Sequence, residues 1–248
     1  PQVEPLALDE AFLDVTASEK LFGRAPEVAK AIKLAIWDEL QLVASVGVGP
    51  NKYIAKLASD IDKPDGLVVV AEEEVFEFLA PLPIGRIWGV GKVADRTFEK
   101  LGIRTIGQLR HYSPAVLHQH FGSSGGQFLQ LANGIDERPV VSEQEAKSIS
   151  NETTFAVDID DPVVVHEWLH ALTEQVACRL RAHGLKGRTV QVKVRLADFT
   201  TLTRAQSLPA VTDITSEIWQ VVRHLFEQRL PRPLPALRLV GVGVSNFG

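Results

Sequence analysis

The sequence predicts an α+β protein built from more than one domain. Three observations support this prediction: the order of strand-like and helix-like segments changes twice along the chain, glycine and proline punctuate its middle part, and one late segment alternates strictly between apolar and polar residues. The chain has 248 residues, and its apolar content of 45% with 23% charged residues is that of a globular protein with a sizeable core.

Residues 1–70 predict a mixed layer of strands and helices. Residues 6–15 are apolar with acidic insertions, which predicts a buried strand, and residues 26–40 have helical spacing after a favourable Pro26. Asn51 is the expected cap of a second helix, placed between short strands at 43–48 and 67–70. The order β-α-β-α-β predicts part of one α/β layer.

The rest of the chain predicts two further blocks and a linker. Short helices broken by glycine and proline fill residues 71–138, which predicts a compact all-α unit. Residues 139–147 are polar, begin with Pro139, and predict a linker. Residues 148–248 follow the order β-α-β-β-α-β, which predicts four strands with both helices on one face and the other face open.

Composition narrows the class of protein. The single cysteine, Cys178, excludes an internal disulfide and a cysteine-cluster zinc site, and it fits a reducing compartment. No apolar stretch is long enough to span a bilayer, and the first residues resemble no leader, so we expect no membrane association. The sequence contains no Met, so we expect a processed chain or a fragment.

The charge of the chain is unevenly distributed. The net charge is −5, but residues 1–138 hold 14 Lys and Arg against 19 Asp and Glu, whereas residues 139–248 hold 12 of each. The acidic excess therefore lies in the first part. Net charge is a weak test for binding to DNA, because the distribution of charge over one face decides it.

Asp9 and Glu10 are the first candidate site. Two adjacent carboxylates inside an apolar run are costly to bury unless a cation compensates them. Carboxylate oxygens suit Mg²⁺, which takes few protein ligands and substrate phosphates. The alternative is a strand end with two solvated acids.

The segment from Gly89 to Lys92 is the second candidate. Its glycines, followed by a helical run, predict a helix-hairpin-helix whose backbone N–H groups can hold a phosphate. It is not a Walker loop, because Arg86 and Val93 occupy positions where that motif needs Gly and Ser or Thr. The alternative is an ordinary glycine turn between helices.

His166 and His170 are the third candidate, since H-E-x-x-H on a helix is the pattern of zinc peptidases. The motif is short, no third ligand follows in a matching context, and the rest of this helix has the apolar spacing needed to pack on a sheet. We therefore expect the two histidines to bind no metal, and a zinc peptidase is the least favoured function.

The open face of the predicted sheet is the fourth candidate. Lys193 and Arg195 alternate with apolar residues on one strand, so they share that face. We expect three cations from elsewhere in the sheet to join them: Lys147, Arg204 and Arg238. Such a face can follow a phosphate backbone without contacting bases. The alternative is a solvated face without a partner.

Taken together, these segments resemble the Y-family of translesion DNA polymerases, and the bacterial DinB type most of all. The resemblance lies in residues 4–16 (EPLALDEAFLDVT), 45–52 (SVGVGPNK), 55–66 (AKLASDIDKPDG), 87–92 (IWGVGK) and 134–138 (GIDER). It covers essentially the whole chain, in order and at consistent spacing. Each motif alone is weak, but the set is highly specific.

The resemblance implies a palm remnant at 1–70, a thumb with a helix-hairpin-helix at 71–138, a linker at 139–147 and a little finger domain at 148–248. It implies template-directed nucleotidyl transfer with two Mg²⁺ ions, in which Asp9 and Glu10 are catalytic metal ligands and Lys63 binds the incoming dNTP. It also implies primer–template DNA as the partner of Gly89, Gly91, Lys92 and the open sheet face. We therefore expect a cytoplasmic, nucleoid-associated DNA polymerase.

The chain departs from the family pattern in three respects. The family's first catalytic Asp and its fingers would precede Pro1, so we expect this chain alone to be inactive. Ala7 stands where the family usually has Ser. The resemblance also implies the sliding clamp as a partner, but the chain stops at Gly248, before the usual clamp peptide, so these residues do not supply that contact. A catalytically silent, DNA-binding relative of these polymerases is the alternative function.

Overall fold

The computed structural model describes residues 1–143, 145–231 and 233–248. The chain divides into two compact units, with the boundary between residues 144 and 145. This boundary falls within the segment 139–147 that has linker composition. In the part of the chain that the structure describes, no helix has the length and apolar character needed to cross a membrane.

The first unit begins with a β-hairpin. Strands β1 (Gln2–Pro5) and β2 (Ala11–Asp14) pair antiparallel, with Gln2 opposite Asp14. The N–H groups of Leu6 and Ala7 both donate to the carbonyl of Glu10, which closes the connecting turn. The prediction of one buried strand over 6–15 is therefore wrong: the middle of that segment is a turn. A turn exposes acids that a strand interior would bury without compensation.

A parallel pair of strands follows the hairpin. The helices α1 (Glu19–Phe22) and α2 (Ala25–Leu40) precede β3 (Val46–Val48), which pairs in parallel with β4 (Leu67–Val69) through the crossover helix α3 (Lys52–Ser59). Asn51 caps α3 as predicted, because its side chain accepts a hydrogen bond from the N–H of Ile54 at 3.0 Å. The strands form two separate two-stranded sheets, not the single layer that the sequence predicts.

Short helices complete the first unit. They are η2 (Glu72–Glu74), α4 (Val75–Leu79), η3 (Ile84–Arg86), α5 (Lys92–Lys100), α6 (Ile106–Leu109), α7 (Pro114–Phe121) and α8 (Ser124–Ala132). The buried face of α3, including Tyr53, Ile54 and Leu57, belongs to the same hydrophobic core as these helices. Helix α3 and the short helices of residues 71–138 therefore share one hydrophobic core.

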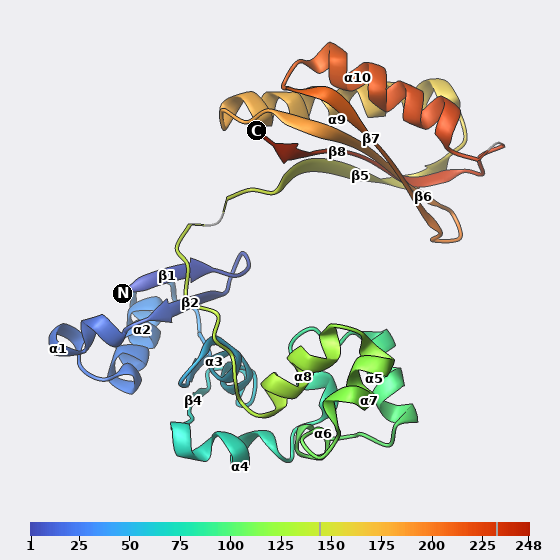
Figure 1. Ribbon diagram of the computed structural model, residues 1–248. Coiled ribbons are helices and arrows are strands. Elements are labelled where there is room, and N and C mark those ends of the chain that lie inside the picture. Colours follow the sequence, from blue (N-terminus) through green and yellow to red (C-terminus); the bar gives the residue numbers. More distant parts are fainter. Residues whose placement is uncertain (144, 232) are drawn as a thin grey trace. The chain divides into compact units, whose positions relative to one another are not determined.

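The second unit is a four-stranded sheet with two helices on one face (Figure 1). Its elements are β5 (Ser148–Ile159), α9 (Pro162–Ala182), β6 (Gly187–Leu196), β7 (Thr201–Thr212), α10 (Thr215–His224), the π-helical turn η4 (Leu225–Arg229) and β8 (Leu237–Phe247). The strand order is β5-β8-β6-β7, and all neighbouring strands are antiparallel. The order β-α-β-β-α-β agrees with the prediction.

The core of the second unit follows from the alternation in β6. Val190, Val192 and Val194 are completely buried against the helices, together with apolar residues of α9 and α10. Because side chains alternate along a strand, Lys193 and Arg195 stand on the opposite, open face. The predicted pattern of this strand thus fixes which face of the sheet is available to a partner.

Candidate functional site

The turn of the first hairpin carries the two predicted carboxylates. Asp9 is exposed at the tip, and Glu10 follows it with a partly buried side chain. Oε1 of Glu10 accepts a hydrogen bond from Nζ of Lys56 at 2.9 Å. The hairpin is therefore held against α3 by one carboxylate, and the other carboxylate is free to meet a ligand from solvent.

A row of alternating charges leads from Glu10 to Lys63. Lys56 also pairs with Asp60 at 3.2 Å, and Asp60 pairs with Lys63 at 2.6 Å. Burial lowers the pKa of Lys56, but its bonds to Glu10 and Asp60 raise that pKa by more. Burial raises the pKa of Asp60, but the two lysines lower it by more. Each partner thus favours the charged form of Lys56 and of Asp60, and the row links the carboxylate hairpin to the predicted nucleotide lysine.

The sequence did not lead us to assign Lys56 and Asp60 to the site, although both lie in the family motif at residues 55–66. Their spacing was the available signal, because residues i and i+4 are neighbours on a helix surface. Lys33 was missed as well. Its Nζ donates to the carbonyls of Ala44 at 2.5 Å and Asp65 at 2.8 Å, and so it anchors the turn that presents Lys63.

A buried ion pair supports the base of the hairpin. Nζ of Lys52, the first residue of α3, lies 2.9 and 2.7 Å from the two carboxylate oxygens of Glu4 in β1. Glu4 also accepts from the N–H of Val141 at 2.9 Å. The pKa of Glu4 is held below its ordinary value, first by the bond from Lys52 and then by the bond from Val141. The strand before the carboxylates is thus tied to α3 and to the segment that leaves the unit.

An aromatic stack connects the same hairpin to the glycine turn. The ring of Phe12 in β2 stacks on Trp88, with 5.7 Å between centroids, and Trp88 directly precedes Gly89. The guanidinium of Arg138 lies 4.4 Å from the centroid of the Trp88 ring. The same guanidinium donates two hydrogen bonds to the carboxylate of Asp136, at 2.6 and 2.8 Å. The Phe12–Trp88 contact therefore connects the carboxylate hairpin to the glycine turn.

The donor set fits a hard divalent cation in its chemistry. Asp9 and Glu10 supply carboxylate oxygens, the ligand type that Mg²⁺ prefers, and Mg²⁺ needs only one or two protein carboxylates beside substrate phosphates. Over the described ranges of the chain, no group of three or more His, Cys, Asp or Glu residues could hold a metal ion.

The glycine turn has the geometry of an anion site. Gly89 has a φ of 91°, which only glycine adopts without strain, and Gly91 precedes α5 without contributing a side-chain cap. Lys92, the first residue of α5, is exposed. The first N–H groups of a helix have no partner within it, and they favour a negative charge. A phosphate contact at this turn stays a prediction.

The open sheet face retains only part of its predicted cations. Lys193 lies on it and pairs with Glu152 at 2.7 Å, and Nε of Arg195 donates to Thr201 at 3.0 Å. Lys147 is exposed just before β5. The placement of Arg204 on this face is wrong, because it is paired in register with the buried Val192, which puts its side chain on the helix face.

Two of the predicted cations have other partners. Nε of Arg204 donates to the carbonyl of Arg229 in η4 at 2.8 Å. Arg238 makes two bonds to Asp158 at 3.1 and 3.2 Å, and its guanidinium lies over the ring of Phe199. Neither side chain is available as an unpaired cation of the open face.

The histidine pair of α9 lies apart from these features. His166 pairs with Glu227 at 3.5 Å and His170 with Glu174 at 3.8 Å, whereas both rings meet Trp219 edge-on. The two imidazoles therefore face different carboxylates and share an aromatic neighbour.

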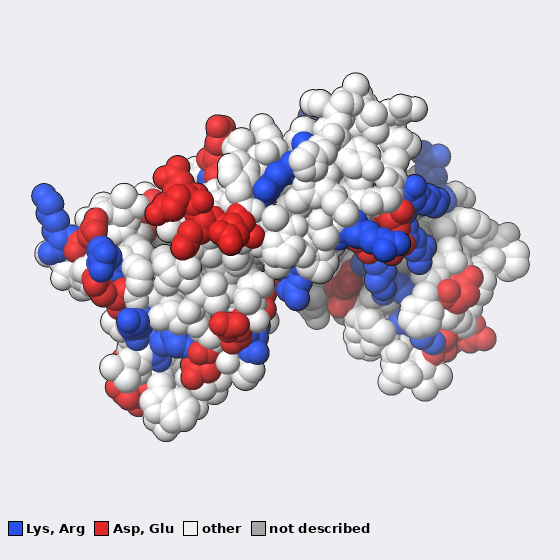
Figure 2. All heavy atoms as spheres, turned by 90° about the horizontal axis from the view of Figure 1, so that it is seen from below, with Lys and Arg blue, Asp and Glu red and all other residues white. Residues whose placement is uncertain are grey.

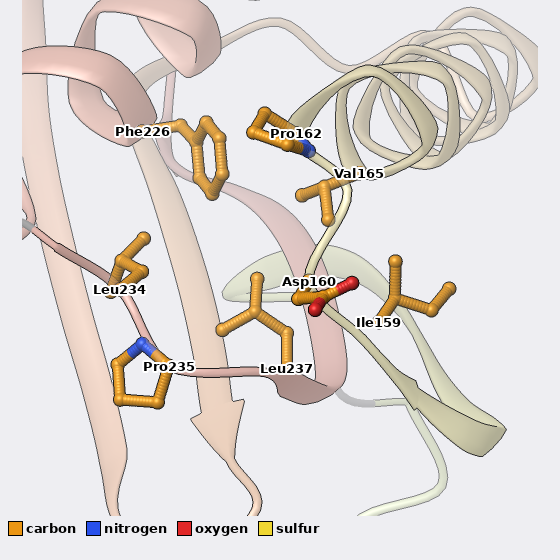
Figure 3. Close-up of a pocket in the computed structure, with 8 residues that line it drawn as sticks. All are labelled: Ile159, Asp160, Pro162, Val165, Phe226, Leu234, Pro235 and Leu237. Carbon is orange, nitrogen blue, oxygen red and sulfur yellow. The ribbon is translucent and has the colours of Figure 1, made fainter.

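A small hollow in the second unit is also separate from the carboxylates. It has a volume of about 50 Å³ and lies between the end of β5, the start of α9 and the segment before β8 (Figure 3). Phe226, Val165 and Leu237 are among its apolar lining residues, and Asp160 supplies its carboxylate. A hollow of this size holds little more than a water molecule, so it is not a substrate site.

Comparisons with known proteins identify the family of the chain. The model of the impB/mucB/samB family matches residues 1–60, the IMS family HHH motif matches residues 72–103, and the impB/mucB/samB family C-terminal domain matches residues 146–248. The chain is 42% identical to DNA polymerase IV of Desulfatibacillum aliphaticivorans, over 100% of this chain and 62% of that protein. It is also 42% identical to DNA polymerase IV of Alkalilimnicola ehrlichii, over 100% of this chain and 69% of that protein.

A solved structure shows the same architecture. A Y-family DNA polymerase chimera superimposes with a TM-score of 0.85 at 26% identity, over 99% of this chain and 71% of that one. The chain thus spans between about three fifths and seven tenths of the length of these proteins. From matches that run along its whole length, the chain belongs to the impB/mucB/samB family, the Y-family of DNA polymerases, and is of the DNA polymerase IV type.

Proposed function

We propose that the protein to which this chain belongs is a template-directed DNA polymerase that copies damaged templates. One observation carries the proposal: the exposed Asp9–Glu10 turn is linked through Lys56 and Asp60 to Lys63, which places metal-type carboxylates and a phosphate-type cation in one charged row. The names of the relatives, DNA polymerase IV, support the same activity.

Asp9 and Glu10 would hold the catalytic Mg²⁺. Two such ions, when bound, supply activation of the primer 3′ hydroxyl and stabilisation of the leaving pyrophosphate. The residues of this chain orient that site: Lys56 holds Glu10 against α3, and the Glu4–Lys52 pair holds the strand from which the turn projects. The relatives are longer than this chain, so we propose that an upstream segment contributes the remaining ligand and the fingers.

Lys63 binds the triphosphate of the incoming dNTP in this proposal. Its ammonium is half-exposed and is held by Asp60, so it can exchange a carboxylate for a phosphate at small cost. Lys33 keeps the turn around Lys63 in place through the carbonyl of Asp65. The nucleotide cation is thus preorganised by two residues that never touch the nucleotide.

The remaining parts hold primer–template DNA. We propose palm, thumb and little finger roles for residues 1–70, 71–138 and 148–248. The turn at Gly89, Gly91 and Lys92 would contact a phosphate of one strand, and Lys193 and Arg195 on the open sheet face would contact phosphates elsewhere. Because the proposed substrates are chromosomal DNA and dNTPs, we propose that the protein acts in the cytoplasm.

Primer extension tests this function directly. The full-length protein with Mg²⁺ should add the dNTP that is complementary to the template base, and chelation of the metal should stop the addition. The 248-residue chain alone should not extend a primer. Robust extension by this chain would mean that the reaction centre is elsewhere, and DNA binding without extension by the full-length protein would favour the silent, DNA-binding relative.

Binding to DNA is tested separately on the 248-residue chain. Replacing Lys193 and Arg195 together with Ala should weaken binding about equally for two unrelated primer–templates. It should also flatten the dependence of log affinity on log salt by up to about two units, because each phosphate contact contributes roughly one. An unchanged slope would show that the open sheet face does not contact DNA.

A further inference from the structure

The open face of the second unit has a lane without side chains along its central strand. Gly241 and Gly243 of β8 stand on this face, between β5 on one side and β6 on the other. A Cβ added at Gly241 would lie 2.9 Å from Cβ of Glu152, and one added at Gly243 would lie 3.2 Å from Cβ of Ser150. Side chains at these positions would fill the space, so the two glycines leave a strip of the sheet whose surface is formed by backbone atoms.

An ion pair crosses this glycine lane. Gly241 is paired in register with Glu152 of β5 and with Lys193 of β6, and Nζ of Lys193 meets Oε2 of Glu152 at 2.7 Å. The bridge is possible because glycine leaves nothing between them. The side chains of Lys193 and Glu152 are 28% and 50% exposed, so the pair closes the lane at its surface and not in the core.

Glu152 is the acid of this face. In the paired stretches of the four strands, the open-face positions carry Lys193, Arg195 and one carboxylate, and the others are small, hydroxyl, amide or apolar residues. Figure 2 shows Lys and Arg side chains beside Asp and Glu side chains on the face of the molecule that it presents. A phosphate that approaches Lys193 therefore competes with an internal carboxylate.

We propose that Glu152 and Lys193 form a charge gate on the nucleic-acid surface of this unit. The carboxylate occupies the ammonium until a phosphate of a DNA backbone replaces it, so Glu152 sets how tightly and how salt-sensitively the face binds. The gate rests on the proposed DNA contact of the open sheet face. An exposed pair of this kind is weak, so opening it lowers affinity by only about twofold to fivefold and leaves binding reversible.

The test is a charge-neutral variant, Glu152→Gln, in the 248-residue chain. Binding of a fluorescently labelled primer–template is measured by anisotropy at several salt concentrations. Glu152→Gln should tighten binding about twofold to fivefold at low salt and steepen the salt slope by up to about one unit. The matched control is Glu167→Gln, which removes the same charge from an exposed position of α9 and should change affinity by less than about twofold.

A second background isolates the gate from overall charge. When Lys193 is replaced by Ala, Glu152→Gln should lose most of its effect, because the ammonium that the carboxylate blocks is gone. An equal gain in both backgrounds, or no gain in the wild-type background while Lys193→Ala still weakens binding, would overturn the gate and leave the DNA contact standing. Failure of Lys193→Ala to weaken binding would overturn both.

Discussion

Nζ of Lys52 lies 2.7 Å from Oε2 of Glu4, and the two side chains retain only 10% and 7% of their exposure. The residues are 48 positions apart, and Glu4 stands in the strand that leads to Asp9. This pair joins the start of α3 to the base of the carboxylate hairpin. Lys52 also faces the ring of Phe12 in the second strand of that hairpin, at 5.4 Å from the centroid.

Removal of one partner of this pair should destabilise the protein. Lys52→Met leaves Glu4 charged and buried without its ammonium, so we expect a loss of about 2–4 kcal/mol in the free energy of unfolding. Urea unfolding followed in the first unit measures it. The control is Lys30→Met on the exposed side of α2, which should stay within about 0.5 kcal/mol. A loss as small as that of the control would show that the pair contributes nothing.

The same pair makes stability depend on acid. The bonds from Lys52 and Val141 lower the pKa of Glu4 below its ordinary value of 4.5. A depressed pKa means that this contribution is fully present above the unfolded value and is lost as pH falls through the folded one. The melting temperature of the wild-type protein should therefore fall as pH drops below about 4.5. In Glu4→Gln, the melting temperature should depend less on pH over the same range. Parallel pH profiles for the two proteins would contradict the assignment.

Lys63 should affect the use of nucleotide more than the binding of DNA. In the full-length enzyme, Lys63→Ala removes a contact to the triphosphate, so kcat/KM for the dNTP should fall about tenfold or more while the Kd for primer–template stays within about twofold. Asp60→Asn loosens Lys63 without removing it, so its effect should be smaller. Lys30→Ala is the control. A Lys63→Ala enzyme with normal nucleotide use would remove this residue from the site.

His166 and His170 should bind no zinc. Their rings meet Trp219 edge-on and their nitrogens face separate carboxylates, Glu227 and Glu174. Metal analysis of the purified chain should find no stoichiometric zinc, and His170→Ala should leave the metal content unchanged. One zinc per chain that disappears in His170→Ala would reverse this prediction.

The sequence predicted best where one periodic pattern decides the structure. The alternation at 190–196 belongs to a central strand with one buried face, so the valines and the cations could be assigned to opposite sides. The cap at Asn51 follows from local chemistry, and its side chain accepts the expected hydrogen bond from the N–H of Ile54. These elements depend on near neighbours in the chain.

The predictions failed where residues that are distant in the sequence determine the local structure. An apolar run with acids, such as 6–15, fits a strand or a hairpin equally, because no glycine or asparagine marks the turn. Arg204, Leu202 and Leu208 lie an even number of residues apart, so the sequence already places them on one face of the strand. Only the pairing of Arg204 with Val192 shows that this face is the one covered by the helices. The Glu4–Lys52 pair, between residues of two distant motifs, has no signal in spacing at all.

In the proposed reaction, the Asp9–Glu10 turn holds the metal for nucleotide transfer. The most direct test of this role is the rate of single-nucleotide addition by the full-length enzyme with Asp9→Ala, measured at saturating dNTP beside the affinity for primer–template. Loss of a catalytic metal ligand should lower the rate by at least about a thousandfold while DNA affinity changes by less than about threefold. An Asp9→Ala enzyme that adds nucleotides within about tenfold of the wild-type rate would contradict the account.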